Sequence, residues 1–278
     1  MNVDASVNAG APSTLVLRRD GPVLHITLNR PEVRNAMSLL MVRELREALA
    51  QAHASGEVRV LVLRGAGGHF CSGGDIKDMA AARLSSGEAG AESGSPAMLA
   101  TNAAFGELCV EYASTPLALV AVPEGTVMGG GFGLACVADV VVAGDSVVFR
   151  LPETALGVVP AQIAPFLVER LGYSEAKRLA VSGGKLDAQQ ALALRLVHEV
   201  HAADALDAAV QRVVHGILQC APGAVAATKA LIAKARFATP ASLVQEAAGV
   251  FSRALLGPEG IEGTTAFLQK RKPAWAAT

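Results

Sequence analysis

The sequence predicts an α/β fold in which short, buried strands alternate with helices. Three apolar runs carry this prediction, and helical sequence lies between them: RVLVLRG at 59–65, LALVAVP at 117–123 and DVVVAG at 139–144. Continuous runs of Val, Leu and Ala are typical of parallel strands that are covered on both faces. Across all 278 residues, 51% are hydrophobic and only 18% are charged, which is a composition suited to a large core.

The N-terminal elements follow in order along the chain. Residues 1–13 are small and polar, and we expect a flexible tail there. TLVLRR at 14–19 and VLHITLNR at 23–30 alternate apolar and polar residues around Asp20-Gly21, which predicts a β-hairpin. Ser38 is placed to cap the helix that follows, because apolar residues then recur on one helical face. These residues are Val42, Leu45, Leu49 and Ala52.

The later part of the chain is predicted to be mainly helical. The stretch 84–96 is small and polar and predicts a loop or lid. From Ser174 onward the sequence favours helices, whose starts or breaks are marked by Pro222, Pro240 and Pro258. We therefore divide the chain into the tail, a core at 14–200 and a C-terminal helical region at 201–278.

Charge and cysteine usage restrict the function classes. The formal net charge is −1, so no global field favours a nucleic acid or an anionic membrane as partner. The four cysteines lack metal-ligand spacing, and none of the six histidines has it either, so we expect no metal. The N-terminus has no basic region followed by an apolar run, and the longest charge-free apolar stretch, 125–138, is short and rich in glycine. We expect a cytoplasmic protein without a signal peptide or membrane span.

Two glycine-rich turns are the candidate functional elements. GGHFCSGGDIKDM at 67–79 and GTVMGGGFGLA at 125–135 each follow an apolar strand and open a helix. Backbone N–H groups at helix starts have no intrahelical partner, and glycine lets a ligand approach them closely. Two such groups that converge on one carbonyl oxygen would form an oxyanion hole.

Other readings of these turns fit less well. A dinucleotide fingerprint needs Gly or Ala at position 134, which is Leu134, and a G-x-S-x-G elbow around Ser72 needs glycine at position 70, which is Phe70. His69 and Cys71 are two residues apart on an extended segment, so their side chains point to opposite faces. We therefore disfavour a Cys–His nucleophilic pair.

Five motifs in register resemble the enoyl-CoA hydratase/isomerase (crotonase) superfamily, and the resemblance runs from about residue 14 to the end. The motifs are NRPEVRNA at 29–36, FCSGGD at 70–75, GGG at 129–131, LPE at 151–153 and FLQKRKPAW at 267–275. The resemblance implies a spiral of ββα units with a C-terminal helical region, assembled as a trimer or hexamer. It also implies an acyl-CoA substrate, with coenzyme A as part of the substrate and no separate cofactor.

The resemblance assigns catalytic roles to Gly74 and Gly130, whose N–H groups would hold the thioester oxygen, and to Glu153. Family hydratases carry a further glutamate three residues beyond the second donor, where this chain has Gly133. Either Glu153 alone adds water to a 2-enoyl-CoA, or the chain is an enoyl-CoA isomerase, or it binds CoA without turnover. A glycine at 133 is also expected to widen the pocket for a branched or acidic acyl group.

Gly133, the lone glutamate and PAQIAPFLVERLG at 160–172 are similar to the bacterial glutaconyl-CoA hydratases, of the methylglutaconyl type in leucine degradation or the isohexenylglutaconyl type in terpene degradation. The resemblance implies further contacts to CoA and substrate. Most of the residues concerned also have a plainer alternative, such as a helix start, a surface arginine or an amphipathic C-terminal helix. These residues are Arg34, Ala36, Gly74, Asp75, Ile76, Lys77, Gly130, Phe267 and Lys270.

Overall fold

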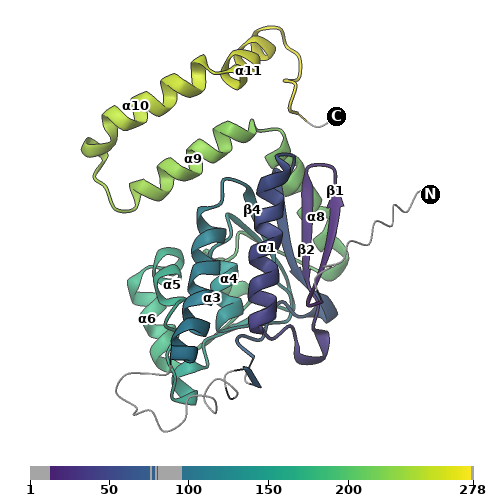
Figure 1. Ribbon diagram of the computed structural model, residues 1–278, viewed down its shortest axis with the longest axis vertical. Coiled ribbons are helices and arrows are strands. Elements are labelled where there is room, and N and C mark those ends of the chain that lie inside the picture. The colour runs from purple at the N-terminus through teal and green to yellow at the C-terminus, as the bar shows by residue number, and fades with distance from the viewer. Residues whose placement is uncertain (1–12, 76, 79, 81–95, 277–278) are drawn as a thin grey trace, which may run out of the picture.

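The computed structural model describes residues 13–75, 77, 78, 80 and 96–276 (Figure 1). A six-stranded sheet forms its centre, in the order β1-β2-β3-β4-β6-β9, and a three-stranded sheet, β5-β7-β8, lies beside it. The strands of the first sheet are β1 Leu15–Asp20, β2 Val23–Leu28, β3 Val60–Gly65, β4 Ala118–Val122, β6 Val140–Gly144 and β9 Glu199–His201. Those of the second are β5 Thr126–Met128, β7 Val148–Arg150 and β8 Lys185–Asp187.

The predicted hairpin and the predicted parallel strands are both present. β1 pairs antiparallel with β2 across a turn in which Gly21 has a φ of +52°. From β2 onward the neighbours in the large sheet are parallel, and the register aligns Leu61 of β3 with Leu119 of β4. All side chains of β4 are buried, which confirms the expectation drawn from its continuous apolar run.

Helices cover both faces of the large sheet, and alternate strand residues face each layer. Val60 and Val62 pack with α8 (Ala203–Leu218), whereas Leu61 and Leu63 belong to the cluster that includes α1 (Leu39–Ser55). Ser38 caps α1, accepting a hydrogen bond from the Met41 N–H at 3.2 Å as predicted. The body also contains α3 Pro96–Ser114, α4 Gly130–Cys136, α5 Ala164–Leu171, α6 Tyr173–Ser182 and α7 Ala188–Ala193. The 3₁₀ turns are η1 Pro31–Val33, η2 Ala66–Gly68 and η3 Glu153–Leu156.

The sequence predicted almost only helices after Ser174, but the structure also has two strands there. β8 joins the small sheet antiparallel to β7, and β9 becomes the edge strand of the large sheet beside β6. Each of these strands has only three residues, too few to show a period of two in the sequence. The ββα units thus continue to residue 201 and form the spiral that the resemblance implied.

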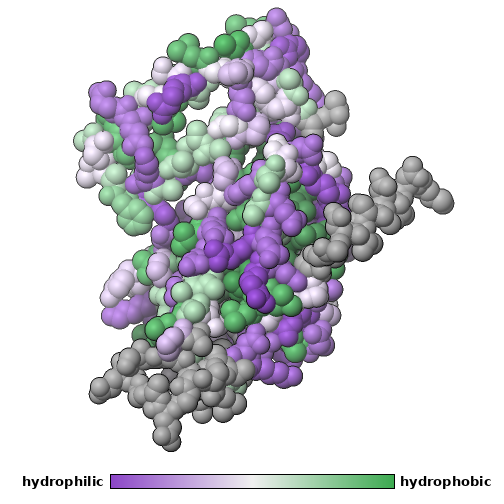
Figure 2. Space-filling view, viewed as in Figure 1, coloured by the Kyte–Doolittle hydropathy of each residue, from purple (hydrophilic) through white to green (hydrophobic). Residues whose placement is uncertain are grey.

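The last three helices form a layer at one end of the molecule (Figure 1): α9 Pro222–Ala235, α10 Pro240–Leu256 and α11 Pro258–Leu268. Each begins with the proline that the sequence had marked. α9 and α10 bury no residue, and Figure 2 shows hydrophobic residues at the surface of this layer. In the described part of the chain no single helix is long and apolar enough to cross a bilayer. Taken together, α8 and α9 have the length and apolar composition of a membrane span, but the two helices are bent by 97° relative to each other.

Candidate active site

The two glycine-rich turns lie against each other. The Cys71 N–H donates to the Thr126 carbonyl at 3.1 Å, and the Met128 N–H donates to the Cys71 carbonyl at 2.9 Å. A Cβ at Gly73, whose φ is +98°, would lie 3.2 Å from the Met128 carbonyl oxygen. These contacts bring the predicted donors Gly74 and Gly130 to neighbouring positions on two packed loops.

Within the described part of the chain, the N–H groups of Gly74 and Gly130 have no hydrogen-bond acceptor. The flanking Asp75 N–H, by contrast, donates to the Met37 carbonyl at 2.9 Å. Gly130 is the first residue of α4, where an N–H has no partner within the helix. This arrangement is compatible with the predicted oxyanion hole.

Each glycine of the 129–131 run has its own close neighbour. Gly129 has a φ of +48°, and a Cβ there would lie 2.8 Å from Glu153 Oε1. A Cβ at Gly131 would lie 2.5 Å from the Cys71 carbonyl oxygen, and one at Gly130 would lie 3.2 Å from the Phe105 ring. Close packing of the two turns, the carboxylate and the ring therefore explains the run.

Glu153 is the carboxylate of this site. It begins η3, and its Oε1 approaches Gly129, as the Cβ distance above shows. Its Oε2 is buried and has no hydrogen-bond partner in the described part of the chain. Burial raises the pKa of Glu153 above its ordinary value. A half-buried carboxylate with an unused oxygen and a raised pKa is suited to accept and return a proton.

The expectation that Gly133 widens the pocket is wrong, because another side chain occupies that space. A Cβ at Gly133 would lie 2.3 Å from Ile163 Cγ2, and 3.7 Å from the ring of Phe105. Ile163 is buried at the start of α5. Beside it, Gln162 Nε2 donates to Asn102 Oδ1 at 2.6 Å. An apolar residue thus fills the space next to position 133, where the resemblance implied that hydratases carry a further glutamate.

Asn35 organises the site, although the sequence analysis assigned it no role. Its Nδ2 donates to the carbonyls of Ala66 and His69 at 2.9 and 2.7 Å, and its Oδ1 accepts from the Arg30 N–H at 2.8 Å. Asn35 is fully buried with a φ of +57°. Asparagine tolerates this conformation better than most residues do. An asparagine two residues after η1, next to the C-cap Arg34, was therefore the signal in the sequence that could have identified it.

The residues expected to contact CoA near the first turn have different surroundings. Arg34 is exposed, and its carbonyl accepts from the Ser72 N–H at 3.0 Å. The carbonyl of the half-buried Ala36 accepts from Arg30 Nη1 at 2.6 Å. Lys77 is exposed. Ile76 lies outside the described residues, as does most of the predicted loop at 84–96, whose last residue begins α3.

Asp75 is committed to an ion pair. Its Oδ2 lies 2.8 Å from Arg30 Nη1, and its Oδ1 accepts from the Lys77 N–H at 2.9 Å. Burial alone would raise the pKa of Asp75, but the Arg30 charge and these hydrogen bonds outweigh burial and lower it. The Asp75 carboxylate therefore holds the turn in place.

We expect Asp75→Asn to lower the free energy of unfolding by about 1–3 kcal/mol, because it weakens a hydrogen-bonded ion pair that is largely shielded from water. Urea unfolding at pH 7 measures this change. In the wild type, the stabilisation that the ionised Asp75 carboxylate provides should decrease as the pH falls, since folding lowers the pKa of Asp75. A rise in KM for acyl-CoA at unchanged stability would instead assign Asp75 a direct role in binding.

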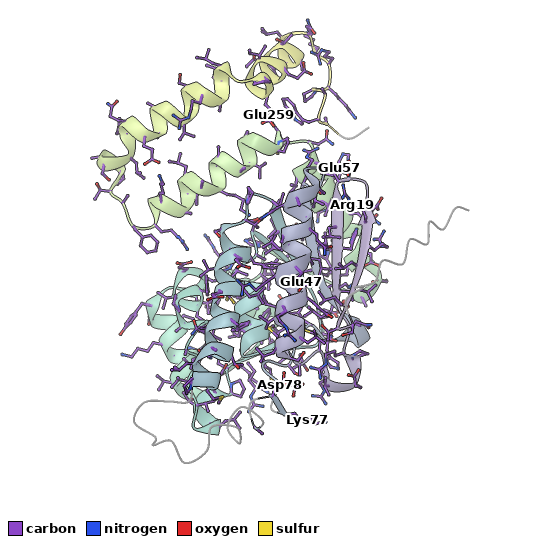
Figure 3. All side chains as sticks on the ribbon, in the orientation of Figure 1. Arg19, Glu47, Glu57, Lys77, Asp78 and Glu259 are labelled. Carbon is purple, nitrogen blue, oxygen red and sulfur yellow. The ribbon has the colours of Figure 1, made fainter. Side chains whose placement is uncertain are left out.

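Phe267 and Lys270 lie far from the two turns within one chain. Lys77 and Glu259, which precedes Phe267 on α11, stand at opposite ends of the molecule (Figure 3). The Phe267 side chain is 83% exposed. The structure of one chain therefore does not bring these two residues to the predicted site.

The His69–Cys71 pair does not form. Cys71 is fully buried, and burial raises the pKa of its thiol to about 12, which leaves almost no thiolate at neutral pH. His69 Nδ1 accepts instead from the Thr126 N–H at 3.1 Å. All four cysteines are unpaired, and only Cys220 is exposed.

The chain is similar to known proteins along most of its length. The family model described as enoyl-CoA hydratase/isomerase matches residues 18–278. A 2,3-dehydroadipyl-CoA hydratase of Escherichia coli is 34% identical over 94% of this chain and 98% of its own. The solved structure of Pseudomonas aeruginosa AtuE is 52% identical, with a TM-score of 0.89 over 95% of this chain and 100% of its own. An enoyl-CoA hydratase/isomerase from Marinobacter aquaeolei is 49% identical, with a TM-score of 0.89 over 95% and 99%.

Proposed function

Because the chain belongs to the enoyl-CoA hydratase/isomerase family, we propose that it hydrates a 2-enoyl-CoA with Glu153 as its single acid–base group. One observation carries the proposal: Glu153, with a buried and unpartnered carboxylate oxygen, lies beside the two glycine turns. The position at which the family has another carboxylate is closed by Ile163.

The proposed reaction uses three groups of this chain. The N–H groups of Gly74 and Gly130 bind the thioester oxygen and stabilise the negative charge that develops there. Glu153 takes a proton from water while the hydroxyl adds to C3, which gives an enolate. Glu153 then returns the proton to C2, so that one water has been added and the carboxylate is restored. Because both new bonds form on one face of the substrate, one carboxylate serves both steps.

The acyl group is proposed to be branched or to carry a second carboxylate, as in a glutaconyl-type thioester of leucine or terpene breakdown. The name of the Escherichia coli relative describes an acyl group with a distal carboxylate. The half-buried Phe105 ring lies against Gly130, and the Asn102–Gln162 amide pair adjoins the buried Ile163. An apolar ring and an amide pair in this region support an acyl group with both apolar and polar parts.

A panel of enoyl-CoA thioesters tests the function. We expect the absorbance of the conjugated thioester to fall while a 3-hydroxyacyl-CoA appears, fastest with branched or carboxylated substrates. A shifted double bond without a hydroxyl group would assign the isomerase reaction, which uses the same N–H groups and carboxylate. Binding of acyl-CoA without any turnover would assign a non-catalytic CoA-binding protein.

The proposal includes assembly as a homotrimer or hexamer through the C-terminal helices. Large apolar side chains of this layer are exposed in one chain, which marks a surface that another subunit would cover. They include Ile232, Phe237, Phe251, Leu256, Phe267 and Leu268. In such an assembly, Phe267 and Lys270 would serve the CoA site of a neighbouring subunit.

Sedimentation at micromolar concentration is expected to show a trimer or hexamer. Phe251→Asp should shift the protein toward smaller species, because it buries a charge in the apolar contact. Gln245→Asp, at an exposed position on the same helix, is the matched control and should leave the assembly unchanged. A monomeric wild-type protein would remove both the assembly and the proposed role of Phe267 and Lys270.

A further inference from the structure

We propose that His69 is a positioning residue whose neutral imidazole joins the two glycine-rich turns and fixes the spacing of the Gly74 and Gly130 N–H groups. The inference rests on the proposed function of those two groups as an oxyanion hole. His69 itself touches neither substrate nor reacting atoms. It acts through the backbone of residues 125–130.

The backbone pairing of the two glycine-rich turns is interrupted at Thr126. Cys71 pairs with Val127 in parallel fashion, through the bonds to Thr126 and Met128 given above. A regular parallel ladder would continue with the Thr126 N–H donating to the His69 carbonyl. That carbonyl accepts instead from Asn35 Nδ2 at 2.7 Å. The Thr126 N–H is therefore left without its regular acceptor.

The His69 side chain replaces the missing acceptor. Its Nδ1 takes the Thr126 N–H at 3.1 Å. Since a backbone N–H can only donate, this Nδ1 carries no proton, and the neutral ring holds its proton on Nε2. The imidazole thus continues the connection between the turns where the ladder cannot. In place of one backbone–backbone hydrogen bond there are thus two hydrogen bonds, from Asn35 Nδ2 to the His69 carbonyl and from the Thr126 N–H to His69 Nδ1, and they join three loops.

Gly125 makes room for this side chain. Its φ is +51°, and a Cβ there would lie 2.7 Å from His69 Nδ1 and 2.3 Å from the Gly68 carbonyl oxygen. A side chain at position 125 would therefore displace the imidazole from the Thr126 N–H. The ring and the glycine form one local arrangement, only five residues before the donor at Gly130.

The consequence for catalysis follows from the geometry of the hole. Two N–H groups act together only when both point at one oxygen, and loss of one such donor typically lowers turnover by about 10²–10³-fold. Without the His69 acceptor, residues 125–130 can shift relative to residues 71–75. Such a shift should weaken binding of the developing enolate more than binding of the ground-state thioester.

The test compares His69→Leu, which has similar size and no acceptor, with His69→Asn, whose Oδ1 offers an acceptor near the position of Nδ1. His215→Leu, at an exposed histidine on α8, is the control. We measure kcat and KM with the best enoyl-CoA, thermal unfolding, and the ultraviolet absorbance of the enolate of bound acetoacetyl-CoA. His69→Ala replaces His69→Leu if the leucine variant does not fold.

His69→Leu is expected to lower kcat by about 10–100-fold with KM changed by less than about threefold, and to weaken the enolate absorbance. His69→Asn should recover most of both signals, and His215→Leu should match the wild type. Wild-type kcat and enolate absorbance in His69→Leu would overturn the proposal, and so would an asparagine variant as impaired as the leucine variant. If the wild type hydrates no thioester, the proposed function fails, while the enolate signal still tests His69.

Discussion

Glu153→Gln is expected to lower turnover by about 10²–10⁴-fold and to leave the affinity for acyl-CoA almost unchanged. The amide has nearly the size of the carboxylate but cannot take a proton from water. The N–H groups of Gly74 and Gly130 are untouched by this change, so thioester binding should persist. Steady-state kcat and KM with the best enoyl-CoA measure the two effects separately.

The pH dependence of the wild type tests the same role. Burial raises the pKa of Glu153, and only the ionised carboxylate can act as the base. The value of kcat/KM should therefore fall as the pH drops through this raised pKa, at a higher pH than for an ordinary glutamate, near 4.3. The residual kcat/KM of Glu153→Gln should not show this fall at low pH.

The contribution of Glu153 to the free energy of unfolding should depend on pH in the opposite sense to kcat/KM. A carboxyl whose pKa is higher in the folded chain stabilises the fold at low pH and loses that contribution as the pH rises through the folded pKa. The melting temperature of Glu153→Gln minus that of the wild type should therefore be larger at pH 8 than at pH 4. Near-native turnover of the variant would refute the single-glutamate mechanism. Glu124 would then be tested next, although it is already paired with Arg64 at 2.9 Å.

The parts of the fold that repeat a strong local pattern could be predicted from the sequence. β3 and β4 are continuous apolar runs because both faces of the sheet are covered, and Ser38 and the three C-terminal prolines mark helix starts by local chemistry alone. β8 and β9 could not be predicted in this way. Their three residues each are fixed by pairing with distant strands and show no period of their own.

The site shows the same division between local and distant causes. The glycines at 129–131 could be recognised as a close approach, but the sequence does not reveal which atoms approach them. That Asn35 reaches the His69 carbonyl and that Ile163 fills the space at Gly133 depend on contacts between residues about 30 positions apart. A missing glutamate therefore suggested an enlarged pocket, whereas a side chain from another element closes it.

Gly133→Glu is expected to destabilise the protein by about 1–3 kcal/mol and to impair the native reaction, because the new side chain meets a filled space. Even the first added carbon would lie 2.3 Å from Ile163 Cγ2. Gly133→Ala is the matched control, since it adds this carbon without a charge. Chemical unfolding of both variants measures the steric cost, and the difference between them measures the additional effect of the carboxylate.

Combining each variant with Ile163→Ala distinguishes the steric effect of the added side chain from the effect of its charge. Ile163→Ala alone leaves a cavity that costs about 2–5 kcal/mol. In the double variants the cavity and the added side chain compensate, so the measured loss of stability should be smaller than the sum of the single losses. Gly133→Ala/Ile163→Ala should then recover much of the native activity lost in Gly133→Ala.

Gly133→Glu/Ile163→Ala should remain impaired on the native substrate, because two neighbouring carboxylates raise the pKa of one of them and Glu153 no longer titrates alone. This variant carries the two-carboxylate arrangement that the resemblance implied for hydratases, so we expect it to gain activity on short, linear enoyl-CoAs. Additive stability losses would show that Ile163 is not what excludes a side chain at position 133. Full native activity of Gly133→Glu alone would show that the acid–base site accepts a second carboxylate as it stands.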